Sequence, residues 1–212
     1  MFRGSASATA GVMSIRTQAL LCAARAHGEH GAVVRLMTER HGLVAGYVAG
    51  ARGRQLRPVL IPGNALDAEI ADRGDGRLPS IRVELVTSRG PWLTEPLASA
   101  AIAWACALTA AALPEGHPYP ALYRALAALL DAVCHAPSAR GWARALAGYE
   151  ALLLHEAGYG KALMPPADEP WPDLLARLDR TGRAIAEHLL ADRTRDAMAT
   201  REILLDRLGR IA

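Results

Sequence analysis

The front of the chain alternates short apolar runs with glycine-containing and charged turns. Five such runs fall between residues 18 and 87, and each has a length typical of a β-strand. In the last of them Ile81, Val83 and Leu85 alternate with Arg82 and Glu84, as in a strand with one buried and one solvated face. The five runs cover residues 19–25, 32–37, 43–48, 64–71 and 81–86. This pattern predicts a small OB-like barrel, and an SH3-like barrel fits almost as well.

After Pro91 the pattern changes to long helical segments. Residues 97–113 are almost wholly apolar. This run is shorter than the roughly 20 residues that a bilayer requires, and it lacks basic flanks, so a buried central helix is favoured over a membrane span. Amphipathic stripes predict four more helices, which begin at Pro120 and near residues 139, 172 and 197.

These patterns together predict an α+β protein with two domains. A five-stranded OB-fold barrel is expected over residues 14–90, followed by an all-α helical bundle over residues 91–212. Residues 1–13 contain no hydrophobic run of the kind that a secretory signal needs, and a second methionine, Met13, closes them. We expect them to be a disordered tail or a misassigned start.

The charge is divided unequally between the two predicted domains. The whole chain carries a formal charge of +3, but residues 1–90 carry +5 and residues 91–212 carry −2. The front half is therefore the expected partner of a polyanion. The three cysteines, Cys22, Cys106 and Cys134, are scattered in apolar surroundings. They are best explained as reduced, buried thiols of a cytoplasmic protein.

Arginines concentrate in the stretch HGLVAGYVAGARGRQLRP, residues 41–58. A predicted strand breaks at Gly50 and Gly53 into a loop that holds three arginines within six residues. Glycine lets a backbone approach a polyanion closely, and each guanidinium offers a planar fork to phosphate oxygens. A solvated loop that happens to be basic is the alternative. The DNA-binding candidates of the front half are Arg25, Arg35, Arg40, Arg52, Arg54, Arg57 and Arg82.

Aromatic residues are scarce in the predicted barrel. Tyr47 is the only one between Gln18 and Arg89. A barrel that stacks one base after another is therefore excluded, and the grip on nucleic acid is expected to be mainly electrostatic and indifferent to sequence.

No catalytic constellation is found. The chain has no G-x-S-x-G, no Walker A loop and no dinucleotide fingerprint after a strand. The histidines His27, His30 and His41 fall in or near predicted turns, where they are weak evidence for a metal site, and a solvent-facing turn is the default interpretation. A non-enzymatic protein is predicted.

Three segments resemble, in order and spacing, the RecO family of bacterial recombinational repair proteins. They are HGLVAGYVAGARGRQLRPVLIPGN, LASAAIAWACALTAAALPEGHPYPALYRALAALLDA and YEALLLHEAGYG. The resemblance covers roughly residues 14–160, about two thirds of the chain. It implies an N-terminal OB fold and a helical C-terminal domain.

The resemblance also implies a function and partners. Members of this family bind single- and double-stranded DNA, anneal strands, engage the C-terminal tail of single-stranded DNA-binding protein (SSB), and act with RecR to load RecA. Many members carry a cysteine-bearing zinc module after the Gly-Tyr-Gly segment. In this sequence no cysteine follows Cys134, so neither zinc nor another cofactor is expected. The expected location is the cytoplasm, in association with the nucleoid and without a membrane.

Two other functions stay open. The first is a protein-interaction adaptor that receives the acidic SSB tail on Arg124, Arg140 or Arg144, for each of which an ordinary solvated helix position is the simpler interpretation. The second is an RNA-binding barrel protein, which would share the charge pattern but gives no reason for the alanine-rich helices.

Overall fold

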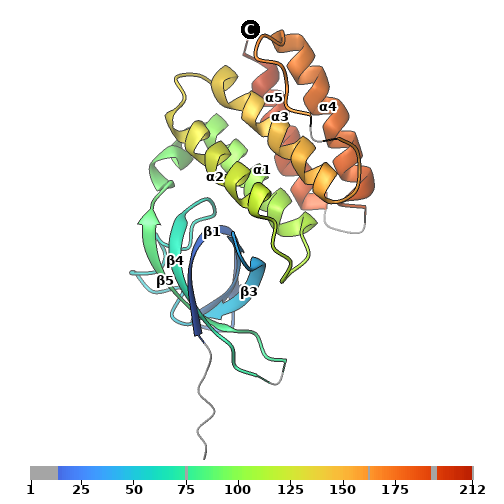
Figure 1. Cartoon of the computed structure of the whole chain (residues 1–212). Helices are drawn as coiled ribbons and strands as arrows, with labels where there is room; N and C mark the ends of the chain where they lie inside the picture. The colour runs from blue at the N-terminus through green and yellow to red at the C-terminus, as the bar shows by residue number, and fades with distance from the viewer. Residues whose placement is uncertain (1–13, 75, 162, 192–194, 212) are drawn as a thin grey trace, which may run out of the picture.

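The computed structural model describes residues 14–74, 76–161, 163–191 and 195–211. A β-barrel occupies one end of the molecule and a group of helices the other (Figure 1). The tail predicted over residues 1–13 lies outside the described residues.

Five strands form a closed barrel in the spatial order β1-β2-β3-β5-β4. Neighbours are antiparallel, except that β3 and β5 meet in parallel at a single pair, Tyr47 opposite Ser80. The predicted OB-type fold is confirmed, and each strand lies within a few residues of its expected position. The strands are β1 (Ser14–His27), β2 (Gly31–Thr38), β3 (Gly42–Val48), β4 (Ala65–Ala71) and β5 (Ser80–Thr87).

Strand β1 is longer than predicted because it pairs with two different strands of the barrel. Its first half pairs with β4 and its second half with β2, and the register with β2 shifts between Leu21 and Ala23. Such an irregularity bends a strand and increases its twist, as closure of a small barrel requires. Leu21 packs in the barrel core, whereas Leu20 and Cys22 belong to the core formed with the helices.

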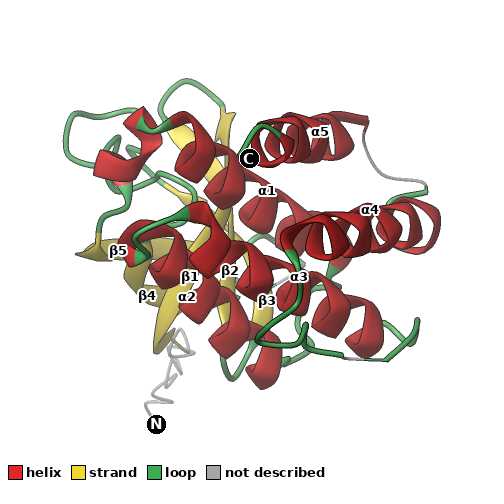
Figure 2. Ribbon diagram, turned by 90° about the horizontal axis from the view of Figure 1, so that it is seen from above, coloured by secondary structure: helices red, strands yellow, loops and turns green. Residues whose placement is uncertain are grey.

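The helical part consists of a 3₁₀ turn and five helices, again close to the predicted positions. They are η1 (Gly90–Thr94), α1 (Pro96–Ala112), α2 (Pro120–His135), α3 (Ala139–Glu156), α4 (Trp171–His188) and α5 (Arg195–Gly209). Seen from above, α1 and α2 lie over the barrel, while α4 and α5 lie to one side and farther from it (Figure 2). Helix α1 is buried on almost every side, as predicted for the apolar run. Within the described part of the chain, no helix is long and apolar enough to cross a membrane.

The barrel and the helices share one apolar core. Leu20, Met37 and Leu43, from three different strands, are buried in the same cluster as residues of the helices. Polar contacts add to this interface. The Arg89 side chain, only 3% exposed, donates to the Gly63 carbonyl at 2.6 Å and to Asp131 Oδ1 of α2 at 2.5 Å. The two parts are therefore held in a defined orientation.

Candidate nucleic-acid interface

The loop between β3 and β4, residues 49–64, is anchored to the barrel at its far end. Leu56, Val59 and Leu60 pack against the barrel core. The buried Asn64 side chain donates to the carbonyls of Pro58 at 3.1 Å and Val59 at 3.0 Å. Because side chains and hydrogen bonds hold this loop down, the residues between its anchors are presented on a fixed base.

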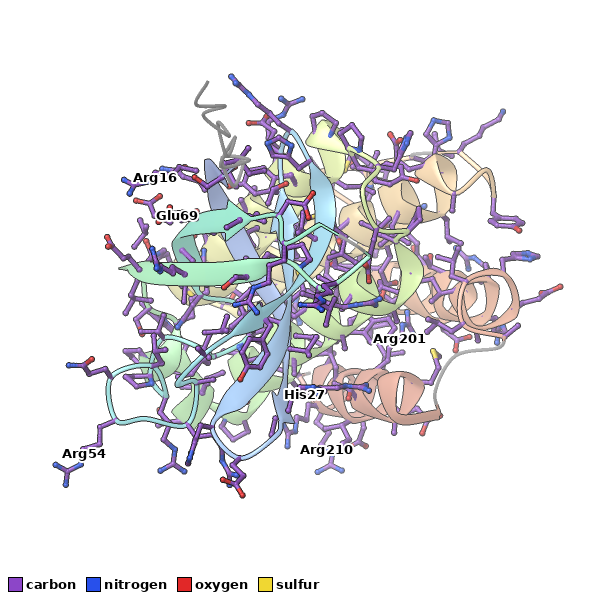
Figure 3. The ribbon with its side chains drawn as sticks, turned by 90° about the horizontal axis from the view of Figure 1, so that it is seen from below. Arg16, His27, Arg54, Glu69, Arg201 and Arg210 are labelled. Atoms are coloured by element: carbon purple, nitrogen blue, oxygen red, sulfur yellow. The ribbon has the colours of Figure 1, made fainter. Side chains whose placement is uncertain are left out.

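Three arginines of this loop, Arg52, Arg54 and Arg57, are exposed. Arg52 donates to the backbone carbonyl of Glu29 at 3.3 Å, which ties the loop to the β1–β2 turn. Among the residues that the structure describes, no carboxylate forms an ion pair with any of the three. Arg54 extends outward from the barrel into solvent (Figure 3). Their charges are therefore available to an external anion.

A hollow of about 370 Å³ lies beside the loop. Its walls carry Arg52 and Arg57, and most of the remaining lining comes from alanine and glycine. Small side chains leave the backbone accessible, and the two arginines of the lining supply positive charge, so a phosphate group would fit there. The lining residues are Ala24, Ala26, Gly31, Ala32, Ala51, Arg52, Arg57 and Leu60.

The other predicted DNA-binding arginines do not form one patch with the loop. Arg25 is exposed on β1, between two alanines that line the hollow, but alternation along the strand directs its side chain to the other face. Arg40 is exposed in the β2–β3 turn, at the opposite end of that hairpin from the β3–β4 loop.

Arg35 requires a correction. It is not on an open strand face but under the helices, where it donates to the Ala110 carbonyl of α1 and to Glu115 Oε1 at 2.6 Å. The sequence placed it correctly on the polar side of β2, but the tertiary structure covers that side with α1. We assign Arg35 to the contact between barrel and helices.

Arg82 also lies in a different environment from the one expected. Its Nη1 is 3.8 Å from Glu69 Oε2, and Arg16 approaches the same carboxylate at 3.7 Å from the other side. Asp67 and Glu84 occupy the neighbouring positions of this face. Arg16 and Glu69 lie together, well apart from Arg54 (Figure 3). Because carboxylates accompany these arginines, this face is less attractive to a polyanion than the loop.

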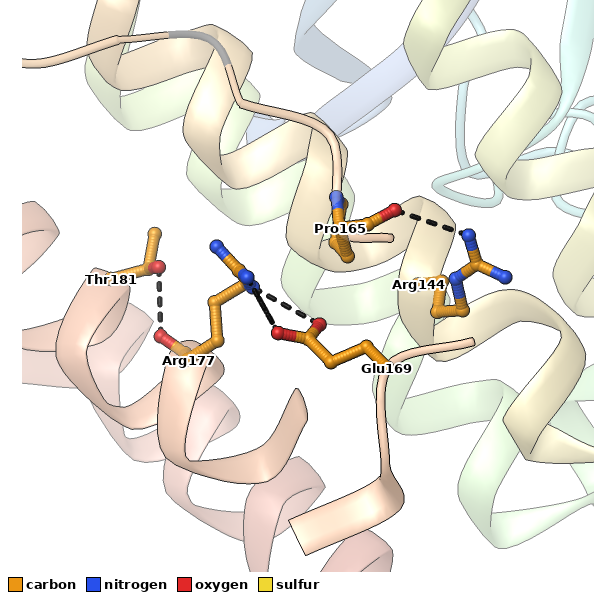
Figure 4. A network of polar contacts seen from close by, with 5 residues as sticks. All are labelled: Arg144, Pro165, Glu169, Arg177 and Thr181. Atoms are coloured by element: carbon orange, nitrogen blue, oxygen red, sulfur yellow. Dashed lines mark hydrogen bonds and ion pairs between the residues drawn. The ribbon is translucent and has the colours of Figure 1, made fainter. Parts of the chain in front are cut away.

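The arginines proposed for a peptide have partners within the protein. Arg124 of α2 donates to Glu39 Oε1 at 2.8 Å, and the Arg140 guanidinium lies 5.3 Å from the centre of the Trp171 ring. Arg144 donates to the carbonyls of Ala167 at 2.6 Å and Pro165 at 3.1 Å, so it holds the segment before α4 against α3 (Figure 4). The structure does not bring the three together into one binding site.

A groove that the sequence analysis missed lies between α3 and α4. Tyr159 stacks on His188 with 4.5 Å between ring centroids and 2° between ring planes. Arg180 and Lys161 add exposed positive charge, and Leu163 adds exposed apolar surface. The one sequence signal was the polar and basic face of α4, on which Arg177, Arg180, Thr181, Ala184 and His188 recur at helical spacing.

Neither the histidines nor the cysteines form a reactive cluster. Within the described ranges no three metal-binding side chains lie together. All three cysteines are free thiols. Burial raises the pKa of Cys106 to about 12 and that of Cys22 well above its usual range, so both thiols are protonated at neutral pH.

The fold and this loop define a class, namely proteins in which an OB-type barrel with an arginine-bearing loop is joined to a helical domain. Residues 13–89 match the family model described as recombination protein O N terminal, and residues 93–165 match the model for its C terminal part. The chain belongs to the RecO family of DNA repair proteins.

Individual relatives agree with this assignment. The chain is similar to the DNA repair protein RecO of Phenylobacterium zucineum, with 38% identity over 177 residues, which are 82% of this chain and 71% of the relative. The corresponding protein of Ruegeria sp. is 39% identical over 176 residues, 82% of this chain and 72% of the relative. That of Rhodospirillum centenum is 43% identical over 143 residues, 67% of this chain and 56% of the relative.

Proposed function

We propose that this protein is a non-enzymatic mediator of DNA repair that grips the sugar-phosphate backbone with its β3–β4 loop. One observation carries the proposal: Arg52, Arg54 and Arg57 are exposed and without carboxylate partners among the described residues, on a loop that the barrel core anchors. Backbone contacts from arginines neutralise phosphates without reading bases. Binding is therefore expected to be strong at low salt and indifferent to sequence.

The first test is the salt dependence of binding to single-stranded DNA. Arg54 and Arg57 make no ion pair with the rest of the described chain, so the double variant Arg54→Ala/Arg57→Ala removes charge without breaking an internal contact. Each lost phosphate contact reduces the slope of log K against log salt by about 0.7 for a single strand. We expect the slope to become shallower by about 1.4 in the variant. Fluorescence anisotropy with a labelled oligonucleotide measures it.

A matched control is Arg183→Ala/Arg210→Ala. It removes the same charge from two exposed positions, Arg183 of α4 and Arg210 directly after α5, where each arginine forms an i,i+4 pair with an aspartate. This variant should keep the wild-type slope. An equal change in both variants would mean that only net charge matters, and it would remove the loop from the site.

The finer part of the proposal concerns partners. We propose that the protein anneals complementary strands in the cytoplasm, at the nucleoid, and helps RecR to load RecA on DNA coated with SSB, without a metal cofactor. An annealing assay with complementary SSB-coated strands, in the presence of EDTA, tests this role. The loop variant should anneal more slowly than wild type at the same salt. Annealing that is no faster than without the protein would reject the role.

An adaptor function is the second candidate, and the α3–α4 groove favours it. Exposed Arg180 and Lys161 flank a stacked tyrosine and histidine, a combination that suits an acidic peptide with an apolar end. A labelled peptide copy of the SSB tail should bind wild type and bind Arg180→Ala more weakly. Tighter binding of an RNA strand than of a DNA strand of the same sequence would instead favour the RNA-binding alternative.

A further inference from the structure

Near the β1–β2 turn the helices no longer cover the outer face of the barrel. On this face, residues paired across β1, β2 and β3 form rows, and a row closer to the turn is more exposed than the row before it. The row Ala23, Arg35, Ala45 is half-buried or buried, with Arg35 bound to α1. In the next row Arg25 of β1 lies opposite Val33 of β2, which lies opposite Tyr47 of β3. This second row forms a shallow shelf that is open to solvent at Arg25.

The Tyr47 side chain leans over the neighbouring strand β2 and does not extend straight into solvent. Its ring sits over Gly31, where a Cβ would be only 2.1 Å from the tyrosine Oη and 2.3 Å from Cε2. The His27 ring meets it edge-on, with 6.1 Å between centroids and 79° between planes. Glycine at position 31 therefore makes room for the ring. Tyr47 remains only half-buried, so part of the ring faces solvent.

The charges around the ring favour an anionic ligand with a flat apolar part. Arg25 is exposed two strand spacings away, about 10 Å between Cα atoms. The β3–β4 loop begins directly after β3, and Arg52 hydrogen-bonds to the β1–β2 turn at Glu29 and His30. Glu115, from the segment after α1, is paired with Arg35, whereas Glu29 of the β1–β2 turn is exposed and lies 3.8 Å from His30 Nε2. The ring therefore shares the outer face of the barrel with Arg25, and the β3–β4 loop begins two residues after it.

We propose that Tyr47 is a stacking position for one unpaired base of single-stranded DNA, with Arg25 holding the neighbouring phosphate. This inference rests on the DNA-binding function proposed above and deepens it. An aromatic face accepts any base, but only when that base is free of its own stack. In a duplex the bases are paired and stacked, so they cannot reach the ring. The shelf would thus let a barrel that grips all DNA by charge distinguish a single strand from a duplex.

A single aromatic position is compatible with the scarcity of aromatic residues in the barrel. One base is held while the flanking nucleotides are held by their phosphates alone. The contact is then insensitive to sequence, as annealing requires, since every base offers a π-face.

The test separates base contacts from phosphate contacts. Two strands of equal length are compared in competition binding, an oligothymidylate and an abasic strand that keeps the phosphates but has no bases. Wild type should prefer the thymidylate by about fivefold or more. Tyr47→Leu, which keeps an apolar side chain over Gly31, should remove this preference, whereas Tyr47→Phe keeps the ring and should retain it. Arg25→Ala should weaken both strands to the same extent.

Several outcomes decide the matter. The inference is overturned if wild type binds both strands equally, or if Tyr47→Leu weakens both equally or neither. Binding of a duplex of the same length should be unchanged in Tyr47→Leu. Melting temperatures verify folding, and Tyr47→Met is the second variant if the leucine variant does not fold. A wild-type protein that binds none of these strands would instead refute the proposed function itself.

Discussion

At the scale of single residues, the most demanding environment is that of Glu150. Its side chain is fully buried in α3, accepts a hydrogen bond from Trp104 Nε1 at 2.7 Å, and pairs with Arg201 of α5 through Nε at 3.0 Å and Nη2 at 2.9 Å. Arg201 also donates to the Leu178 carbonyl of α4. Gly182 leaves room for this guanidinium, because a Cβ there would be 2.1 Å from it. The Glu150 carboxylate thus connects α1, α3 and α5, and its partner Arg201 connects them to α4.

We expect Glu150→Gln to destabilise the protein strongly. The amide can still accept the bond from Trp104, but Arg201 is left as a buried charge without a counterion. Breaking a buried pair in this way costs about 3–5 kcal/mol. Urea unfolding measures the loss. The control Asp206→Asn breaks the exposed pair with Arg210 and should change stability by less than about 0.5 kcal/mol. Similar losses in both variants would contradict this account.

At the scale of elements, the connection between α3 and α4 is held by arginines. Arg144 of α3 binds two carbonyls of the connecting segment, and Arg177 of α4 holds Glu169 with Nε at 3.0 and 3.1 Å from its two oxygens and Nη2 at 2.5 Å from Oε1 (Figure 4). The hydrogen bonds from Arg177 lower the pKa of Glu169. A lowered pKa in the folded state means that this contact stabilises the fold only while the carboxylate is ionised.

The contact therefore predicts a pH-dependent difference between wild type and Glu169→Gln. Above the ordinary glutamate pKa of about 4.3, wild type gains the full contribution and should melt at the higher temperature. As pH falls through the lowered pKa of Glu169, the Glu169 carboxylate of wild type becomes protonated. The difference in melting temperature between the two proteins should then shrink toward zero. Melting curves of both proteins at neutral and acidic pH measure it. A melting-temperature difference that grows on acidification would contradict a stabilising contact of the ionised Glu169.

At the scale of the whole molecule, the barrel and the helices are coupled through a common core. The side chains of Leu20, Met37 and Leu43 project from the barrel and pack in the same cluster as residues of α1. Three further contacts tie the parts together: Arg89 with Asp131, Arg35 with Glu115, and Arg124 with Glu39. The arginines that make these contacts are not available to DNA, whereas those of the β3–β4 loop and Arg25 remain exposed.

This coupling predicts a single unfolding transition. All four tryptophans lie in the helical part, so their fluorescence reports on the helices alone. Leu43→Ala changes the barrel, yet it should shift the tryptophan transition by about 2–5 kcal/mol, because Leu43 is packed against the helices. Two separated transitions, or an unchanged tryptophan signal, would mean that the two parts unfold independently.

The order and type of the elements followed from local patterns. Period-two alternation and glycine turns indicated the strands, and apolar stripes with prolines at their starts indicated the helices, because these signals depend only on neighbouring residues. The family resemblance was likewise present in three contiguous segments and is confirmed. The candidacy of Arg52, Arg54 and Arg57 came from their spacing in one loop, and whether they bind DNA stays a prediction.

What the sequence could not determine is which polar faces the chain would cover with its own distant segments. Arg35 looked like Arg25 in the sequence, ten residues apart on adjacent strands, yet α1 pairs one and leaves the other exposed. Arg82 acquired Glu69 as a partner through the register of β4 and β5. Tyr47 found its place over Gly31 only through cross-strand packing. Local patterns decide what a segment forms, whereas ion pairing and exposure depend on segments far away in the chain, and only the tertiary structure brings those together.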